Sequence, residues 1–236
     1  MPNAITKRIP NTVTCLNLFS GCIAIVMAYE ANYILALGFI VLSAIFDFFD
    51  GMLARLLNAP SPIGKELDSL ADDVSFGVAP AMMVFSFLKE PQLTYPDFLT
   101  PIQAYVPYFA FLIAVFSALR LAKFNIDERQ TSSFIGLPTP ANALFWASLI
   151  VGGSNFIFAH FNVIWILVLV LIFSLLLTAE IPMFALKVKN LKWADNKIQY
   201  IFLLVAIPLL IFFQWSGIAA VIAWYILLSL ITQKKG

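Results

Sequence analysis

Long apolar runs divide the chain into segments of about the length that crosses a lipid bilayer. Residues 9–29 and 98–119 carry no charge, and the charge-free runs 130–179 and 198–233 are each long enough for two crossings. Two further spans, at about 33–57 and 64–88, hold six of the 13 acidic residues. With breaks expected near 152–155 and 214–217, the pattern predicts an all-α, polytopic membrane bundle of about eight transmembrane helices.

The composition supports a membrane protein and excludes several soluble classes. The chain is 61% hydrophobic and 11% charged, whereas a soluble domain carries about 25% charged residues. Lipid is the solvent that accommodates this apolar excess. The net charge of +1 provides no basic field for nucleic acid. We therefore expect one membrane domain over residues 1–236, without a nucleic-acid partner.

The basic residues predict how the bundle is oriented. If both termini are cytoplasmic, 13 of the 14 Lys and Arg residues lie at or near the inner side, and only Lys89 lies outside. Basic residues are concentrated in cytoplasmic loops of membrane proteins. The sequence thus predicts cytoplasmic termini and an outer loop at residues 89–100.

Acidic side chains occur where lipid disfavours them. Six of the chain's 13 acidic residues fall between positions 47 and 73. Charged side chains are costly inside a membrane, so their presence in a span indicates a functional site. Asp47 and Asp50 share one helix face, and Asp68 and Asp72 share another. The turn at 58–63 makes the two helices an antiparallel hairpin, so the four carboxylates converge roughly 10 Å from it.

Four neighbouring carboxylates need positive charge, and no Lys or Arg is placed to neutralise each of them. Oxygen ligands favour Mg²⁺ or Mn²⁺, and two such ions would form a clamp for phosphoryl-type transfer. The small residues Gly51, Ala54 and Gly64 leave room beside the acids for a phosphate-bearing ligand. A purely structural polar cluster is less consistent, because Ser, Thr and Asn normally join membrane helices.

The acidic segment resembles the signature of the CDP-alcohol phosphatidyltransferase family. The pattern D-x2-D-G-x2-A-R-x8-G-x3-D-x3-D runs from Asp47 to Asp72, with every position matched. The stretches 117–125 (SALRLAKFN) and 136–141 (GLPTPA) resemble the phosphatidylserine synthase branch. The resemblance covers about residues 8–180, which we expect to form the catalytic core. Residues 181–236 would add a cytoplasmic loop and two C-terminal transmembrane helices.

The resemblance implies a reaction and a set of roles. The reaction is transfer of a phosphatidyl group from CDP-diacylglycerol to L-serine with release of CMP, at the cytoplasmic face of the cell (inner) membrane, by a homodimer. One of two metals would be held by Asp47, Asp50 and Asp68, and the other by Asp47, Asp68 and Asp72. Asp72 would also be the general base. The residues implied for CDP-lipid binding are Asn11, Thr12, Val13, Thr14, Gly51, Arg55 and Ser61.

Arg120 is a candidate for the acceptor site on its own chemistry. A serine carboxylate in a lipid-flanked pocket needs a fixed cation, and Arg offers a planar bidentate match. Arg120 ends the fourth predicted span on the inner side, so it is alternatively a snorkelling anchor. Two other functions stay open. One is the same chemistry with glycerol phosphate or inositol phosphate as acceptor, and the other is a divalent-metal transporter.

Overall fold

The structure is a computed structural model that describes residues 4–127, 134–184 and 192–232. The long helices of this part of the chain are α1 (Ala4–Tyr29), α2 (Tyr33–Leu56), α3 (Pro62–Asp72), α4 (Ala79–Leu88), α5 (Leu112–Ile126), α6 (Thr139–His160), α7 (Val163–Thr178) and α8 (Lys197–Thr232). The short helices are η1 (Asp73–Val78), η2 (Asp97–Ile102), η3 (Val106–Phe111) and η4 (Trp193–Asp195). Strands β1 (Phe134–Ile135) and β2 (Pro182–Met183) form one antiparallel pair.

Six helical stretches of the described residues are long and apolar enough to cross a membrane. They are Arg8–Tyr29, Tyr33–Leu56, Pro62–Leu88, Val106–Ile126, Thr139–His160 and Lys197–Thr232. The predicted all-α class and the multi-pass membrane architecture are confirmed. The count of eight crossings and the orientation of the termini stay predictions.

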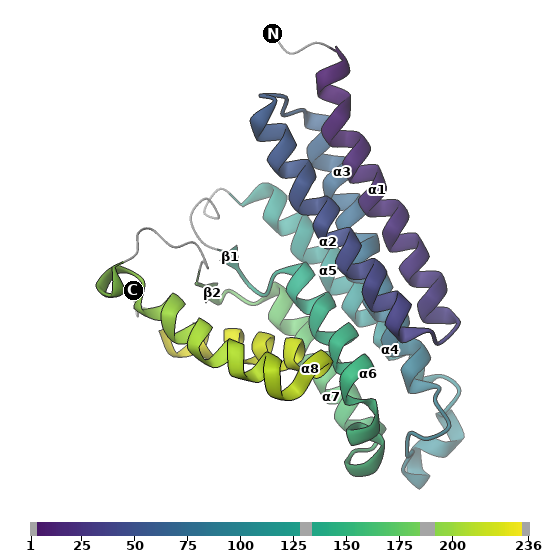
Figure 1. The fold of residues 1–236 in the computed structure, drawn as a ribbon. Coiled ribbons are helices and arrows are strands. Elements are labelled where there is room, and N and C mark those ends of the chain that lie inside the picture. The colour runs from purple at the N-terminus through teal and green to yellow at the C-terminus, as the bar shows by residue number, and fades with distance from the viewer. Residues whose placement is uncertain (1–3, 128–133, 185–191, 233–236) are drawn as a thin grey trace.

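The predicted hairpin of the acidic segment is formed by α2 and α3, which lie against α1 (Figure 1). The turn between the two helices has a left-handed residue, Asn58, with φ 50°. Ser61 then caps α3, because its hydroxyl accepts a hydrogen bond from the Gly64 N–H at 3.1 Å. Pro62 follows at the first helical position, where its missing N–H costs nothing. This local chemistry fixes where α3 begins relative to α2.

The third span continues from α3 through η1 into α4 without leaving helical geometry. Residues 73–78 form a π-helical segment, a rare form that often lies near functional sites. Here α1 approaches closely, and a Cβ atom on Gly21 would lie 2.8 Å from the Cα atom of Ser75. The absence of a side chain at Gly21 therefore allows α1 to pack directly on the helix that carries the acidic residues.

Two predicted span boundaries are wrong. The fourth span is Val106–Ile126 and not 98–119, because the charge-free run starts outside the span, in η2, and the helix continues past Arg120 and Lys123. The predicted break near 152–155 lies inside α6, and the chain turns instead at Phe161, before Asn162 caps α7. Gly152 is a packing contact, since a Cβ there would lie 2.9 Å from the Cα atom of Ser216.

The C-terminal helix α8 contains the predicted break near residues 214–217. Gln214 has φ 49° and ψ −119°, and Gly217 packs against the backbone of Leu209 on the other side of the kink. Helix α8 packs on α6 and lies to one side of the α1–α5 bundle (Figure 1). The acidic hairpin, formed by α2 and α3, therefore lies beside α1 and α5 and away from α8.

Candidate functional site: an acidic centre between two pockets

Three of the four predicted acidic residues meet between α2 and α3. One carboxylate oxygen each from Asp47, Asp50 and Asp68 lies within 4.8 Å of the other two. Asp50 is 6% exposed, and the buried Oδ2 atom of Asp50 and Oδ1 atom of Asp68 have no hydrogen-bond partner. Buried unpaired carboxylate oxygens are costly unless a cation neutralises them. The arrangement therefore fits a divalent metal. The spacing of the acids predicted that these three carboxylates come together, and this convergence is observed.

Asp72, the fourth predicted acid, lies beside this triad and is held separately. Its Oδ1 atom accepts a hydrogen bond of 3.2 Å from the Asn17 side chain of α1. Asn17 is fully buried, and its backbone carbonyl accepts hydrogen bonds of 3.1 Å from the hydroxyls of both Ser43 and Ser75. Asn17 was missed by the sequence reasoning. The only signal was an amide side chain inside an apolar span.

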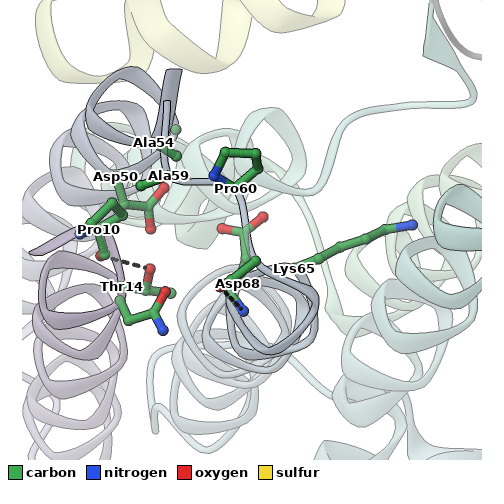
Figure 2. A pocket seen from close by; sticks show the side chains of 12 residues that line it. Pro10, Thr14, Asp50, Ala54, Ala59, Pro60, Lys65 and Asp68 are labelled. Carbon is green, nitrogen blue, oxygen red and sulfur yellow. Dashed lines mark hydrogen bonds between the residues drawn. The ribbon is translucent and has the colours of Figure 1, made fainter. Parts of the chain in front are cut away.

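A first pocket of about 230 Å³ opens between α1, α2 and the start of α3. Asp50 of α2 and Asp68 of α3 face it, and Lys65 is directed away from it (Figure 2). Its lining residues are Pro10, Asn11, Thr14, Asp50, Gly51, Ala54, Ala59, Pro60, Ser61, Gly64, Lys65 and Asp68. The predicted small residues thus lie beside the acids and leave open space there.

Of the four residues on α1 that were predicted to bind the CDP-lipid, two line the first pocket and two do not. Asn11 and Thr14 line the first pocket, and the Thr14 hydroxyl donates a 3.1 Å hydrogen bond to the Pro10 carbonyl. Thr12 is exposed, and neither it nor Val13 is among the lining residues. All four residues lie inside α1, which begins at Ala4.

The other three candidates for CDP-lipid binding surround the same pocket. Gly51 and Ser61 line it. Arg55 is exposed at its edge, and its guanidinium lies over Gly51, where a Cβ atom would be 3.6 Å from the Arg55 Nη1 atom. A guanidinium beside an acidic pocket is suited to bind phosphate oxygens next to a metal.

A second pocket, also of about 230 Å³, lies on the other side of Asp68, between α3 and α5. Its lining residues are Asp47, Lys65, Asp68, Ser69, Asp72, Arg120, Leu121, Phe124, Asn125, Pro138 and Pro140. The two stretches predicted around 117–125 and 136–141 therefore both contribute to it. Asp68 and Lys65 are shared with the first pocket.

Arg120 is buried in this second pocket rather than exposed at a helix end. It is 7% exposed, its Nη1 atom lies 3.5 Å from the Thr139 hydroxyl, and its guanidinium lies 5.2 Å from the centre of the Phe124 ring. A snorkelling Arg keeps its charged group in water. Its burial beside Asp72 thus favours a role in the pocket over membrane anchoring.

Comparison with known proteins identifies the family. The site is an acidic centre on a hairpin of apolar helices, with a pocket on each side, which is suited to a membrane-bound, metal-dependent transferase. The family model described as CDP-alcohol phosphatidyltransferase matches residues 7–153. The chain belongs to the CDP-alcohol phosphatidyltransferase family.

Three relatives are named CDP-diacylglycerol–serine O-phosphatidyltransferase. The protein of Bacillus subtilis is 39% identical over 136 residues, which are 56% of this chain and 69% of that protein. The protein of Mycobacterium leprae is 33% identical over 183 residues, 74% of this chain and 57% of that protein. The protein of Methanocaldococcus jannaschii is 38% identical over 136 residues, 58% of this chain and 57% of that protein. The chain thus matches between about half and two thirds of these relatives' length.

Proposed function

We propose that this protein transfers the phosphatidyl group of CDP-diacylglycerol to the hydroxyl of L-serine and releases CMP. The observation that carries the proposal is the shared acidic wall between two pockets, one beside Arg55 and one containing Arg120. A direct group transfer requires the reacting atoms of the two bound substrates to meet, and two pockets that share Asp68 allow this. The names of the three relatives point to the same donor and acceptor.

The first pocket is suited to the nucleotide and pyrophosphate of the lipid donor. Gly51 and Gly64 give the space, and Asn11, Thr14 and Ser61 supply polar atoms. Arg55 adds positive charge at the edge. The pocket lies at the turn end of the hairpin, so the acyl chains can stay in lipid while the nucleotide extends toward water.

The second pocket is suited to a small acceptor whose only anionic group is one carboxylate. Arg120 is its buried cation, while Lys123 is exposed and does not line it. The ammonium of Lys65 is bonded to the Asn125 carbonyl at 2.9 Å. Acceptors such as glycerol phosphate carry a doubly charged phosphate and are better served by several free cations. The charge balance therefore favours the serine carboxylate.

The reaction requires a base beside the acceptor, and Asp72 is the proposed base because it lines the second pocket. Asp72 takes the proton of the serine hydroxyl, whose oxygen forms a bond to the phosphorus that carries diacylglycerol. The bond from that phosphorus to the bridging oxygen breaks, and CMP leaves with the electron pair. Asn17 orients Asp72 through its 3.2 Å hydrogen bond.

The acidic residues would hold two divalent cations, Mg²⁺ or Mn²⁺. Asp47, Asp50 and Asp68 are the proposed ligands of one, and Asp47, Asp68 and Asp72 of the other. Bound cations would supply Lewis-acid stabilisation of the phosphate charge that develops in the transition state. The unpaired oxygens of Asp50 and Asp68 support this assignment.

We further propose a single membrane domain with its active site at the cytoplasmic face of the cell membrane. Residues 8–180 form the catalytic core, and residues 181–236 add a loop and two C-terminal crossings. The 13-to-1 distribution of basic residues supports cytoplasmic termini. The homodimer implied by the resemblance stays a prediction. A metal transporter is less consistent, because its acids should line a path across the bilayer, whereas here they gather at one end of the hairpin.

An acceptor comparison tests the proposed function. Purified protein in phosphatidylglycerol vesicles containing CDP-diacylglycerol and Mg²⁺ is supplied with L-serine, glycerol 3-phosphate or inositol phosphate. We expect a phospholipid product with L-serine only. A product with a phosphate-bearing acceptor and none with serine would assign the alternative acceptor. Uptake of the metal ion without any lipid product would support the transporter.

A further inference from the structure

Three residues join α3 to the end of α5 by side-chain hydrogen bonds. The Asn125 Nδ2 atom donates to the Ser69 hydroxyl oxygen at 2.8 Å, and the Lys65 Nζ atom donates to the Asn125 carbonyl at 2.9 Å. The Ser69 hydroxyl in turn donates to the Lys65 carbonyl at 3.3 Å. We call Lys65, Ser69 and Asn125 the α3–α5 latch. All three residues line the second pocket.

The latch connects the two walls of that pocket. On α3, Ser69 follows Asp68 directly and precedes Asp72 by three residues, so it belongs to the helix that carries the acids. On α5, Asn125 lies in the last turn, five residues after Arg120. Helix ends are where helices open most easily. A side-chain bond from this turn to α3 therefore fixes the separation of Arg120 from the acids.

The dimensions of the pocket make that separation important. The pocket has a volume of about 230 Å³ and is bounded by α3 with its acids on one side and by α5 with Arg120 on the other. When two ligands differ by one methylene group, an apolar pocket wall prefers one of them by only roughly 10- to 200-fold. A wall held by hydrogen bonds resists expansion, because a longer ligand must break them.

We propose that the α3–α5 latch sets the size limit of the acceptor, holding Arg120 and Asp72 at the spacing that fits L-serine. Ser69 and Asn125 are positioning residues that act through the two helices and not through contact with reacting atoms. The inference rests on the proposed function, since it assigns a selectivity device to the same acceptor pocket.

The test compares L-serine with L-homoserine, which keeps the ammonium and carboxylate groups but has one more methylene. The variants are Asn125→Ala, Ser69→Ala and the double variant, with Ser69→Thr as a conservative replacement that keeps the hydroxyl. Asn155→Ala and Ser154→Ala on the far half of α6 are matched controls, and neither lies in the acidic site. Steady-state kinetics are measured in vesicles for both acceptors and for CDP-diacylglycerol.

We expect Asn125→Ala and Ser69→Ala each to raise the serine KM about three- to tenfold, the usual range for one lost hydrogen bond. The preference for serine over homoserine should fall by at least as much, while kcat and the KM for CDP-diacylglycerol change less than twofold. The double variant should match the single variants, because both remove the same bond. Ser69→Thr and the two controls should behave as the unmodified protein.

The outcomes separate the latch from the proposed function. An unmodified protein that makes no phosphatidylserine would refute the proposed function itself. Serine transfer with an unchanged serine KM and acceptor preference in Asn125→Ala would refute the latch alone. An equal fall in kcat for both acceptors, with a lower melting temperature, would make the latch a general stabilising contact and would also overturn the inference.

Discussion

Replacing Arg120 by Lys keeps the positive charge of the second pocket but removes the planar fork of donors. The guanidinium carries five N–H donors, and its contact with Thr139 is long at 3.5 Å, which leaves donors for a ligand. A carboxylate bound by two parallel hydrogen bonds would retain one with Lys. The prediction is therefore weaker serine binding with the electrostatic attraction largely preserved.

The magnitude follows from the value of one charge-assisted hydrogen bond. Such a bond contributes about 1.5–3 kcal/mol, and the shorter-reaching ammonium recovers part of it. A net loss of about 1.4 kcal/mol corresponds to a tenfold change in affinity. We expect Arg120→Lys to raise the serine KM by about tenfold or more, with little change in the KM for CDP-diacylglycerol.

The assay compares Arg120→Lys with Arg55→Lys in vesicles, with each substrate varied in turn. Arg55 lies beside the first pocket, so its replacement should raise the KM for CDP-diacylglycerol and leave that for serine nearly unchanged. This crossed pattern would distinguish the two pockets. An unchanged serine KM in Arg120→Lys would refute the acceptor role, and a larger effect on the lipid substrate would assign Arg120 to the pyrophosphate.

Three further predictions concern the metal site, the topology and the first pocket. The triad acids are Asp47, Asp50 and Asp68. Activity should be lost in EDTA and in Asn variants of each triad acid, without a change in folding by circular dichroism, whereas the control Asp97→Asn in η2 should stay active. In a protein whose native cysteines are replaced by Ser, Thr94→Cys should react with an impermeant thiol reagent in intact cells and Lys192→Cys should not, and the reverse pattern would overturn the orientation. Gly64→Ala should raise the KM for CDP-diacylglycerol several-fold, because the new Cβ would lie 2.9 Å from both the Asn11 Oδ1 atom and the Ser61 hydroxyl oxygen. A normal lipid KM in that variant would argue against a tight fit at the first pocket.

The part of the site that sequence reasoning found is the part that depends on local geometry. Asp47 and Asp50 share a face because they are three residues apart in a helix, and Asp68 meets them because a short turn makes the hairpin. Such relations need only helix geometry and turn residues. The motif therefore predicted the acidic centre correctly before any packing was known.

The contacts that were missed join residues far apart in the sequence. Asn17 reaches Asp72 from α1 across 55 positions, and Asn125 reaches Ser69 across 56. Neither contact has a spacing that a single sequence displays. The misplaced break in α6 has a related cause, since Gly152 was interpreted locally as an interruption although its role is close packing against α8.

The fourth span was misplaced because absence of charge was used to define it. The buried guanidinium of Arg120 belongs to the helix, and its burial beside Asp72 becomes evident only when α3 and α5 are placed together. A charged residue at a functional site thus shifts the apparent end of a span, here by about two turns of helix.

The central claim is that one acidic centre transfers a phosphatidyl group to serine. Its most direct test measures CMP release and phosphatidylserine formation together, using purified protein in vesicles with CDP-diacylglycerol, Mg²⁺ and ¹⁴C-labelled L-serine. We predict the two products in a one-to-one ratio, dependent on serine, and neither product from Asp72→Asn. Release of CMP without labelled lipid, or full activity of Asp72→Asn, would contradict the account.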